Sequence, residues 1–553
     1  MNKWKKTTSV GLVACTLILA SACSSATSQD VTKSPSTPTS SASSEKKIVE
    51  LTTVRSNPSD IKWDSGESMD KNSVYDAYEQ DLGIRIKNMW VADSKQFAQK
   101  LNMMIASNDI PDFFSVGDQV QLQQLIDADM LMDMSAVFDK YASSETKEWF
   151  TKDGGNQMKS AKVDGKLMAI PLTDSPYNSS SYLWVRKDWL DKLNLPEPKT
   201  MQDVLKISEE FTKKDPGGTG KSFGLTLQKD LFDDYGLTGF FNGYHAYPGI
   251  WQKGADGKLV YGSIQPQMKV ALKQLQDMYK SSQIDPEFGT KDPDKENELV
   301  AANKIGMAYG AFYLSAWPLA SAAIKDGKLV QDWQVYGLPS MDGTPAKSQV
   351  GLGVNGYVVV SKKCKNPEAV IQILNQWIKL QISMTDKERV YINGKELEDK
   401  GKLYFKVNPI RLFAQDGNVK AGGILPKAIE SKDPSILKND PDMTNRYNAV
   451  QNYLKGDMSG WLHWMISKPG GSFSIMNQYL KDNRYEQDQF FGAPTQTMQD
   501  KKAVLDSKEK EVFTKIIMNQ VSIDEFDKFV TDWNNLGGEK ITKEVNDWYA
   551  KQK

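Results

Sequence analysis

The stretch SYLWVRKDWLDKLNLPEPKTMQDV, residues 181–204, predicts a strand followed by the start of a helix. A polar, proline-containing interruption, IPLTDSPYNSSS, precedes it, and its first apolar run predicts a strand. Near its end, Thr200 and Asp203 have the spacing of a capping box, which predicts the start of a helix. That helix carries its apolar residues on one side, at Val204, Ile207 and Phe211. A strand followed by an amphipathic helix is typical of α/β layers.

The same alternation continues along the chain. KIVELTTV (47–54) and DIPDFFSV (109–116) predict strands, and SKQFAQKLNMMIAS between them predicts a helix with an apolar face. The part from residue 48 onward has roughly 500 residues, which is too long for one hydrophobic core. We therefore expect an α/β protein of two or more domains.

The C-terminal segment SIDEFDKFVTDWNNLGG, residues 522–538, predicts a further helix. Ser522 and Glu525 have capping-box spacing, and the two glycines are expected to end the helix. Its predicted buried stripe consists of Phe526, Phe529, Trp533 and Leu536.

The N-terminus has the features of a signal peptide over residues 1–22. Three lysines precede the apolar run VGLVACTLILA, and small residues precede Cys23. LASAC resembles a bacterial lipobox, with Ala20 where leucine is commonest. The resemblance implies a diacylglycerol thioether and an N-acyl chain on Cys23, whereas the alternative is an ordinary signal peptide followed by a chance cysteine. Residues 23–47 are rich in Ser, Thr and Pro and predict a flexible tether.

Charge and cysteine content exclude several classes of protein. Three of the 69 basic residues lie in the signal peptide, which leaves 66 against 70 acidic residues and no basic excess for nucleic acid. The cysteines are Cys15, Cys23 and Cys364, so the processed body has one thiol and no intrachain disulfide is expected.

Motifs for catalysis are mostly absent from the sequence. The two histidines, His245 and His463, are not part of an H-E-x-x-H or Cys/His cluster, and no G-x-S-x-G motif occurs. Cys364 has no identifiable base partner. No catalytic residue and no cofactor is predicted, although a glycosidase-type pair of carboxylates stays open as an alternative.

The stretch DPGGTGKS, residues 215–222, approaches a nucleotide-binding loop. That motif needs a glycine where Asp215 stands, and a carboxylate there would repel phosphate. A charged helical run precedes the loop and the apolar run FGLTL follows it, whereas a P-loop needs a strand and then a helix. We therefore expect no nucleotide site here.

Four stretches together resemble the extracellular solute-binding lipoproteins of bacterial ABC importers, in the carbohydrate-binding family 1 branch related to maltose-binding and alginate-oligosaccharide-binding proteins. They are residues 181–204, 261–288, 355–377 and 522–550. The resemblance implies a two-lobe, periplasmic-binding-protein-like (type II) α/β fold with a hinge between the lobes. It places crossing segments near 173–181 and 336–341. Lobe 1 would comprise 48–174 plus 342–385, and lobe 2 would comprise 175–341 plus 386–553.

The resemblance also implies the function. Such a protein is a monomer, lipid-anchored to the outer face of the cell membrane, that captures a carbohydrate and delivers it to a membrane permease with its ATPase. The alternatives are a secreted glycan-cleaving enzyme and a binder of peptides or other solutes. Some relatives have a calcium loop where Asp215 lies, but Gly217 and Thr219 replace its other ligands, so no metal is predicted.

A carbohydrate site combines aromatic rings with polar side chains, and aromatic residues in loops are its best candidates. Three loop clusters qualify, with the alternative that each ring packs in a core. The candidates are Tyr244, His245, Tyr247 and Trp251 in 241–251, Tyr313 and Trp317 in 309–320, and Trp461 and Trp464 in 459–465. Trp317 also matches, by resemblance, a sugar-stacking position in the maltose-binding branch. From the other lobe the candidates are Trp63, Asp64, Asp112 and Asp118.

Overall fold

The computed structural model describes residues 48–552, except 234, 317, 398–400 and 438–439. The chain from Ile48 onward forms one compact unit. The predicted signal peptide, Cys23 and the tether lie outside the described residues. No helix in the described part is long and apolar enough to cross a membrane.

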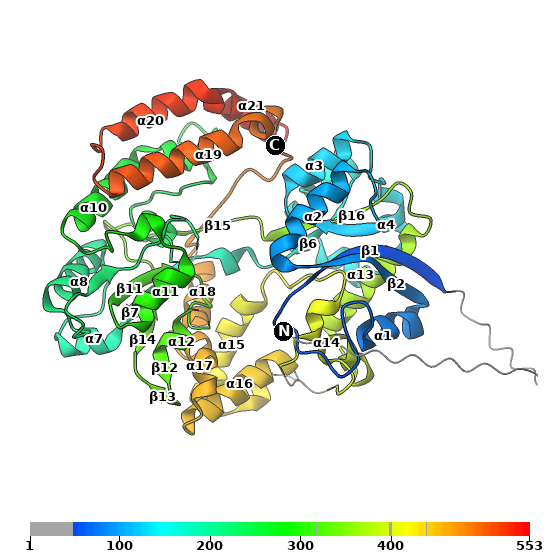
Figure 1. Ribbon diagram of the computed structural model, residues 1–553, viewed down its shortest axis with the longest axis horizontal. Coiled ribbons are helices and arrows are strands. Elements are labelled where there is room, and N and C mark those ends of the chain that lie inside the picture. The colour runs from blue at the N-terminus through cyan, green and yellow to red at the C-terminus, as the bar shows by residue number, and fades with distance from the viewer. Residues whose placement is uncertain (1–47, 234, 317, 398–400, 438–439, 553) are drawn as a thin grey trace, which may run out of the picture. The chain divides into compact units, whose positions relative to one another are not determined.

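The first group of elements begins with residues 48–173 (Figure 1, blue and cyan). β1 (Val49–Asn57) and β2 (Ile84–Asp93) pair in parallel, and α1 (Ser73–Leu82) provides the crossover. The strand predicted at 109–116 is β3 (Phe113–Val116), in a sheet of order β3-β16-β6 with β16 (Val354–Val360) and β6 (Ile170–Thr173). The predicted helix is α2 (Ser94–Ala106).

One hydrophobic core holds this first group together, and it draws on three parts of the sequence. It includes residues between Leu51 and Ile170, and residues between Tyr357 and Leu380 from β16 and α13 (Pro367–Ile382). Tyr391, Tyr404 and Leu412 lie in the same core. Residues 391–412, which we assigned to the second lobe, therefore pack with the first group, because their apolar side chains complete its core.

The second group is built on a four-stranded sheet of order β14-β7-β11-β8. The strand expected in 181–204 is β7 (Tyr182–Arg186), and the others are β8 (Phe223–Leu225), β11 (Ile305–Gly310) and β14 (Trp333–Tyr336). α8 (Met201–Lys214) begins with the predicted capping box of Thr200 and Asp203. A helix therefore precedes the 215–222 loop and a strand follows it, as predicted.

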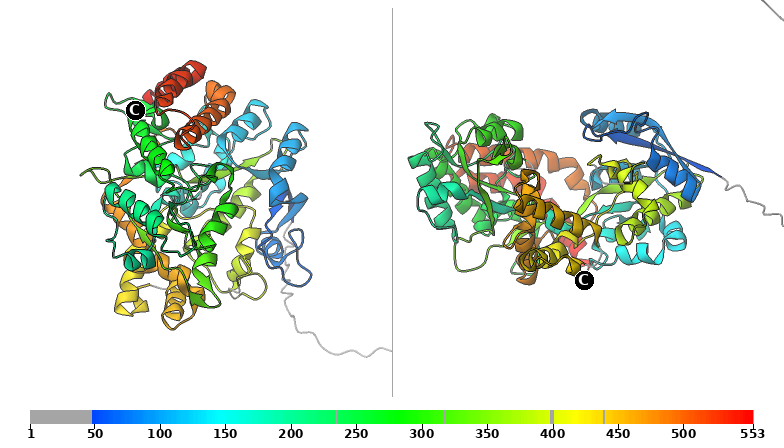
Figure 2. Two further views of the ribbon diagram at one scale, coloured as in Figure 1. Left: turned by 60° about the vertical axis from the view of Figure 1, so that its left-hand side comes forward. Right: turned by 90° about the horizontal axis from the view of Figure 1, so that it is seen from below.

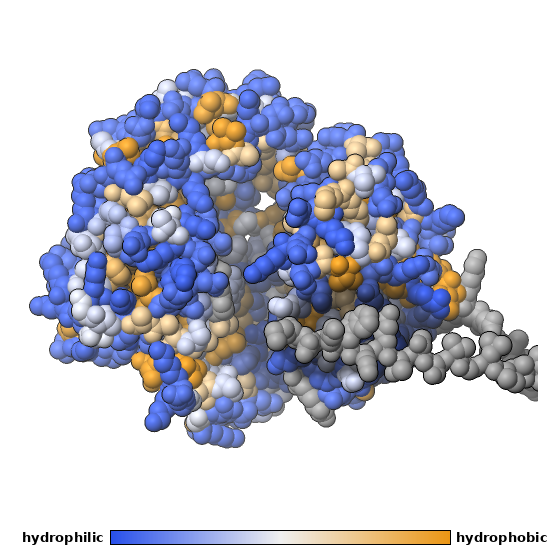
Figure 3. Space-filling view, viewed as in Figure 1, coloured by the Kyte–Doolittle hydropathy of each residue, from blue (hydrophilic) through white to orange (hydrophobic). Residues whose placement is uncertain are grey.

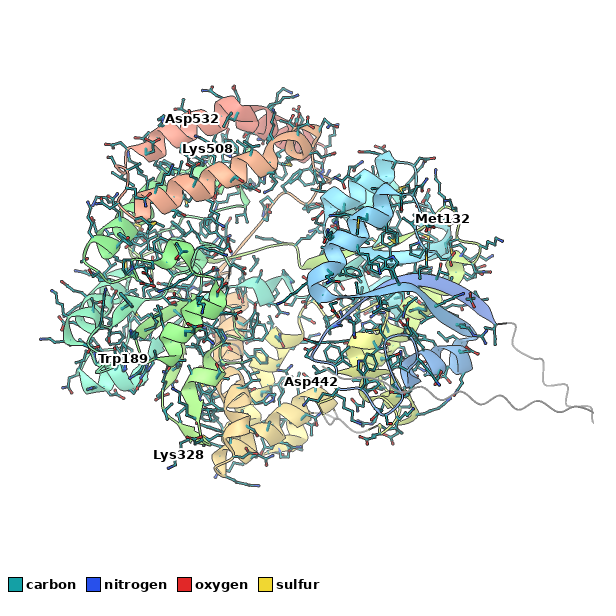
Figure 4. All side chains as sticks on the ribbon, in the orientation of Figure 1. Met132, Trp189, Lys328, Asp442, Lys508 and Asp532 are labelled. Carbon is teal, nitrogen blue, oxygen red and sulfur yellow. The ribbon has the colours of Figure 1, made fainter. Side chains whose placement is uncertain are left out.

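Helices supply the rest of the second group. α19 (Gln496–Ile517) packs beside α10 (Pro266–Lys280), and α20 (Glu525–Trp533) and α21 (Glu539–Ala550) pack against α19. Lys508 and Asp532, 3.1 Å apart, join α19 to α20 (Figure 4). A second set consists of α15 (Gly417–Ser431), α16 (Pro441–Leu454), α17 (Trp461–Ser467) and α18 (Ser472–Lys481), drawn in yellow and orange in Figure 2.

The helix predicted in 522–538 is α20, and it differs in part from its prediction. Phe526, Phe529 and Trp533 are buried as predicted, but Leu536 is exposed. The Ser522 hydroxyl accepts from Asp524 N in a turn before the helix, so it does not cap Glu525. The two glycines do not end the helical run; a wide turn with Gly537 at φ 132° leads directly into α21.

The remaining elements are short and connect those described. They are the helices α3 (Gln119–Asp127), α4 (Ser135–Tyr141), α5 (Ser144–Trp149), α6 (Asn156–Lys159), α7 (Lys187–Lys192), α9 (Thr238–Gly243), α11 (Pro293–Ala301), α12 (Leu319–Ala323) and α14 (Val390–Asn393), and the strands β4 (Lys162–Val163), β5 (Lys166–Leu167), β9 (Trp251–Lys253), β10 (Leu259–Tyr261), β12 (Ile324–Lys325), β13 (Lys328–Leu329), β15 (Ser348–Val350) and β17 (Tyr485–Gln487). The face shown in Figure 3 is mostly hydrophilic, with hydrophobic residues in small separate patches.

Three segments of the described chain cross between the two groups. The first is 174–181, from β6 to β7; the second is 351–353, from β15 to β16; the third is 413–416, before α15. The second crossing expected at 336–341 is wrong. Tyr336 pairs with Leu183 in the second sheet, and Met341 N donates to Gly243 O, so this stretch is part of the second group.

Candidate functional site

A buried glutamine joins the three crossing segments. Gln157 of α6 is fully buried, and its Nε2 lies 3.0 Å from Asp174 O, 3.0 Å from Leu352 O and 2.8 Å from Gly353 O. Its Oε1 accepts from Gln415 Nε2 at 2.5 Å. The side chain of Gln157 thus forms hydrogen bonds with all three crossing segments, at the end of each segment that adjoins the first group.

The carboxylate of Asp174 adds further bonds between these segments. Asp174 accepts from Asn355 Nδ2 at 2.9 Å and from Asn178 Nδ2 at 3.0 Å. Asn178 in turn accepts from Asn418 Nδ2 at 2.9 Å. Gly353 has φ 73°, and a Cβ there would lie 2.6 Å from Asp174 O, so the second segment passes the first more closely than a side chain allows.

The first group has a recess of about 270 Å³ beside the start of the first crossing segment. It is formed by the end of β1, the end of β6 and the chain before α15. Its lining residues include three cations and no carboxylate. They are Thr53, Val54, Arg55, Ser56, Pro58, Phe97, Ser115, Leu172, Thr173, Asn355, Lys406, Asn408, Pro409, Arg411 and Phe413.

The three cations of this recess differ in their partners. Lys406 forms an ion pair with Asp60. Arg55 donates from Nη2 to Lys406 O at 2.9 Å, while its Nη1 is buried and has no hydrogen-bond acceptor within the described structure. Arg411 forms no ion pair with any described residue. Burial and the neighbouring Arg55 guanidinium lower the pKa of Arg411 to about 10, so it stays charged at neutral pH.

The second group has a recess of about 200 Å³ at the other end of the same crossing segment. Its two largest exposed side chains are aromatic, because Phe232 is 39% and Tyr313 is 38% exposed. Backbone and polar side chains complete it. The lining residues are Asn178, Ser179, Ser181, Phe232, Asp233, Gly236, Thr238, Tyr309, Gly310, Ala311 and Tyr313.

Larger recesses occur elsewhere on the described surface. One of about 570 Å³ lies between the β9–β10 hairpin and α21, one of about 410 Å³ lies beside α13, and one of about 580 Å³ lies between α15 and α16. Their lining residues include none of the three crossing segments. A ligand there would not adjoin a crossing segment, so we place the candidate site at the two recesses that flank residues 174–181.

Of the predicted site residues, Tyr313 lines the second recess. Three of the predicted residues in 241–251, namely Tyr244, Tyr247 and Trp251, are buried. Trp251 is 5% exposed and packs against Tyr261, with ring centroids 5.3 Å apart, and Tyr244 packs against Phe240. Burial raises the pKa of the Tyr244 hydroxyl to about 12. Tyr247 is also buried, and His245 Nε2 lies 3.1 Å from Asp342 Oδ1.

The tryptophans of α17 also pack inside the second group. Trp461 is 1% exposed, and the half-buried Trp464 stacks on Tyr453 with centroids 5.9 Å apart. Trp317, the residue with the additional support from resemblance, lies outside the described residues.

The predicted site residues of the first group, Trp63, Asp64, Asp112 and Asp118, contact other residues of that group. Trp63 packs edge-on against Tyr404, and Asp64 forms an ion pair with Lys402, whose hydrogen bond lowers the pKa of that carboxyl. Asp112 accepts from Thr52 N and Oγ1 at 2.8 and 2.6 Å, which ties β1 to the start of β3. Asp118 caps α3 by accepting from Gln121 N.

The Asp215 loop is closed by its own hydrogen bonds. The carboxylate accepts from Gly220 N at 2.8 Å and from the Ser222 hydroxyl, and the hydroxyl bond is the largest cause of its lowered pKa. In the described part of the chain, no three His, Cys, Asp or Glu residues gather as a metal-binding group.

Sequence reasoning missed Phe232, Arg55 and Arg411. Phe232 lies in QKDLFDDYG, where an aromatic flanked by acidic residues was a usable signal. Arg411 stands within the apolar run PIRLF, which is an unusual place for a cation. Arg55 follows the apolar residues of β1 and gave no comparable signal, because many strands end on a charged residue.

Two groups with separate cores, joined by three crossing segments and bearing a recess on either side of them, define a two-lobe binding protein. The family model for bacterial extracellular solute-binding proteins matches residues 66–377, more than half of the chain, and the protein belongs to this family. The α/β two-lobe fold that the sequence predicted is confirmed.

Individual relatives are distant in sequence but match over most of their length. The polygalacturonan/rhamnogalacturonan-binding protein YtcQ of Bacillus subtilis (strain 168) is 22% identical over 84% of this chain and 85% of its own. Lipoprotein LipO of the same organism is 22% identical over 88% and 90%. The crystal structure of the alginate-binding protein AlgQ2 without calcium ion has a TM-score of 0.61 at 15% identity, over 91% of this chain and 98% of that one. These relatives are described by what they bind or by their lipoprotein nature, and none is described as an enzyme.

Proposed function

We propose that this protein is the ligand-binding subunit of an ABC importer and that it captures an oligosaccharide between its two lobes. The observation that carries the proposal is the pair of recesses flanking residues 174–181, one with aromatic faces and one with cationic and amide side chains. Sugar rings have apolar C–H faces and many hydroxyls, and these two kinds of surface match them. The names of the polysaccharide-binding relatives support the same class of ligand.

The mechanism is binding without chemistry. The ligand meets one recess first, and contacts with the other recess are made only when the lobes close on it. Closure is then favoured by the ligand's differential affinity for the closed state. The proposal includes export by residues 1–22, a lipid anchor on Cys23, a monomeric protein at the outer face of the membrane, and transfer of the sugar to a permease driven by its ATPase.

The experiment that tests this function is titration of the purified full-length protein with a panel of neutral and acidic oligosaccharides, followed by intrinsic tryptophan fluorescence. A saturable change with one class of sugar, without release of new reducing ends, is the expected result. A folded protein that responds to no sugar in the panel contradicts the proposal, and release of new reducing ends would indicate a glycan-cleaving enzyme instead.

Replacing Tyr313 with alanine will weaken binding of the identified sugar by about tenfold, because it removes an exposed ring from the second recess. Isothermal titration calorimetry measures the change. Tyr141→Ala is the matched control, since Tyr141 is equally exposed (37%) on α4 and lines neither recess. Equal affinity of the Tyr313 variant and the control would exclude Tyr313 as a contact.

A further inference from the structure

We infer that the recess of the first lobe receives an anionic group of the sugar ligand, with Arg55 and Arg411 as its direct contacts. The inference rests on the proposed function and specifies its ligand as an acidic oligosaccharide. A carboxylate and a sulfate ester present the same chemistry to two guanidinium groups, namely negatively charged oxygens in a plane or fork.

The recess has an excess of positive charge. Of its three cations, only Lys406 forms an ion pair, with Asp60. Arg55 and Arg411 form no ion pair with a described residue, although both line the same recess, where burial and the charge of Arg55 lower the pKa of Arg411. Asp174, an acidic residue of the first crossing segment, already accepts hydrogen bonds from Ser175 N, Asn178 and Asn355.

The two arginines without a counter-ion are unfavourable for the stability of the folded protein. Two neighbouring cations that are partly removed from water destabilise the folded protein unless an anion joins them. The buried Nη1 of Arg55 has no acceptor in the described structure, although buried polar groups nearly always have one. An anion bound in the recess would supply a counter-charge for both guanidinium groups, and no carboxylate lines the recess, so the recess is complementary to a negative charge.

The rest of the recess offers apolar surface and hydroxyl groups next to the two arginines. Phe97 and Phe413 provide apolar surface in the same recess, and Ser56 and Ser115 provide hydroxyls. Its volume of about 270 Å³ is below the roughly 300–1,000 Å³ of pockets that enclose a drug-sized ligand. The recess therefore receives one acidic unit of the chain, and the aromatic recess with Phe232 and Tyr313 is left for the units that follow.

The experiment compares three trisaccharides by calorimetry with the full-length protein: a galacturonic acid trimer, a sulfated galactose trimer and neutral galactotriose. We expect at least one anionic trimer to bind about tenfold or more tightly than galactotriose, and this advantage to shrink with added salt. The two anionic arms distinguish a carboxylate from a sulfate ester.

Arg411→Gln is the decisive variant, because Arg411 has no ion-pair partner to lose. It should reduce binding of the preferred anionic trimer about tenfold or more, while Arg411→Lys keeps part of the affinity. Its melting temperature should be unchanged or higher, since a repulsion is removed, whereas a purely structural arginine would lower it. Arg389→Gln, which removes a partly exposed cation paired with Asp386 in the same lobe, is the matched control and should bind as the unaltered protein does.

The outcomes separate this inference from the proposed function. Preference for neutral sugars, or an affinity for the anionic trimer that is the same in Arg411→Gln and Arg389→Gln, overturns the anionic recess and leaves sugar binding intact. Absence of binding to any sugar, in a protein that melts cooperatively, overturns both.

Discussion

Replacing Gln157 with leucine will lower the free energy of unfolding by about 3 kcal/mol, because the carbonyls of Asp174 and Leu352 and the amide of Gln415 lose their buried partner. Leucine has a similar size but neither donates nor accepts a hydrogen bond. The three crossing segments would also lose a side chain that bonds to all of them. Denaturant unfolding followed by circular dichroism measures the loss.

The same variant should weaken sugar binding even though Gln157 lines neither recess. Both recesses adjoin the first crossing segment, so their relative placement depends on how firmly that segment is held. Gln496→Leu is the matched control, because its exposed side chain bonds only to Asp500 within α19. If Gln157→Leu and Gln496→Leu have the same stability and affinity, the bonds of Gln157 do not stabilise the hinge.

The sequence predicted the local elements well where one stretch contained the whole signal. Thr200 and Asp203 cap α8 as predicted, and Phe526, Phe529 and Trp533 are buried. It failed where a segment depends on a distant partner. Tyr391 lies in the first core because its ring packs against Tyr78 of α1, and Leu412 lies there beside Trp377 of α13, whose Nε1 donates to its carbonyl. Nothing within residues 386–412 indicates these contacts.

The candidate site was harder to predict than the fold for a physical reason. An aromatic residue in a loop suits a sugar and a protein core equally, and Trp251, Tyr244 and Trp461 are buried in the core of the second lobe. Tyr313 is the predicted aromatic that lines a recess. The cationic recess arises from residues 55 and 411, whose proximity only the folded chain establishes, so no local pattern could predict it.

A buried carboxyl group in the second lobe makes stability depend on pH. Glu509 of α19 is buried beside Tyr261 and Ser263, and burial raises its pKa to about 7. In the unfolded chain a glutamate has a pKa of about 4.3. Between these values the folded state keeps a proton that the unfolded state has lost, so the contribution of Glu509 to stability is fully present below about pH 4 and is lost as the pH rises through 7.

Glu509→Gln should therefore be more stable than the unaltered protein at pH 8, by roughly 3 kcal/mol, and about equally stable at pH 4.5. The amide imitates the protonated carboxyl and carries no charge to bury. Part of the pH dependence will remain in the variant, because burial also raises the pKa of Glu296 to about 7 and of Asp488 to about 6.

Denaturant unfolding at both pH values measures the difference in stability between Glu509→Gln and the unaltered protein. Glu511→Gln is the control, since Glu511 is an exposed residue of the same helix paired with Lys515. A Glu509 variant that is less stable at pH 8 would mean that the carboxylate is ionised and held by its hydrogen bonds, which contradicts the burial argument.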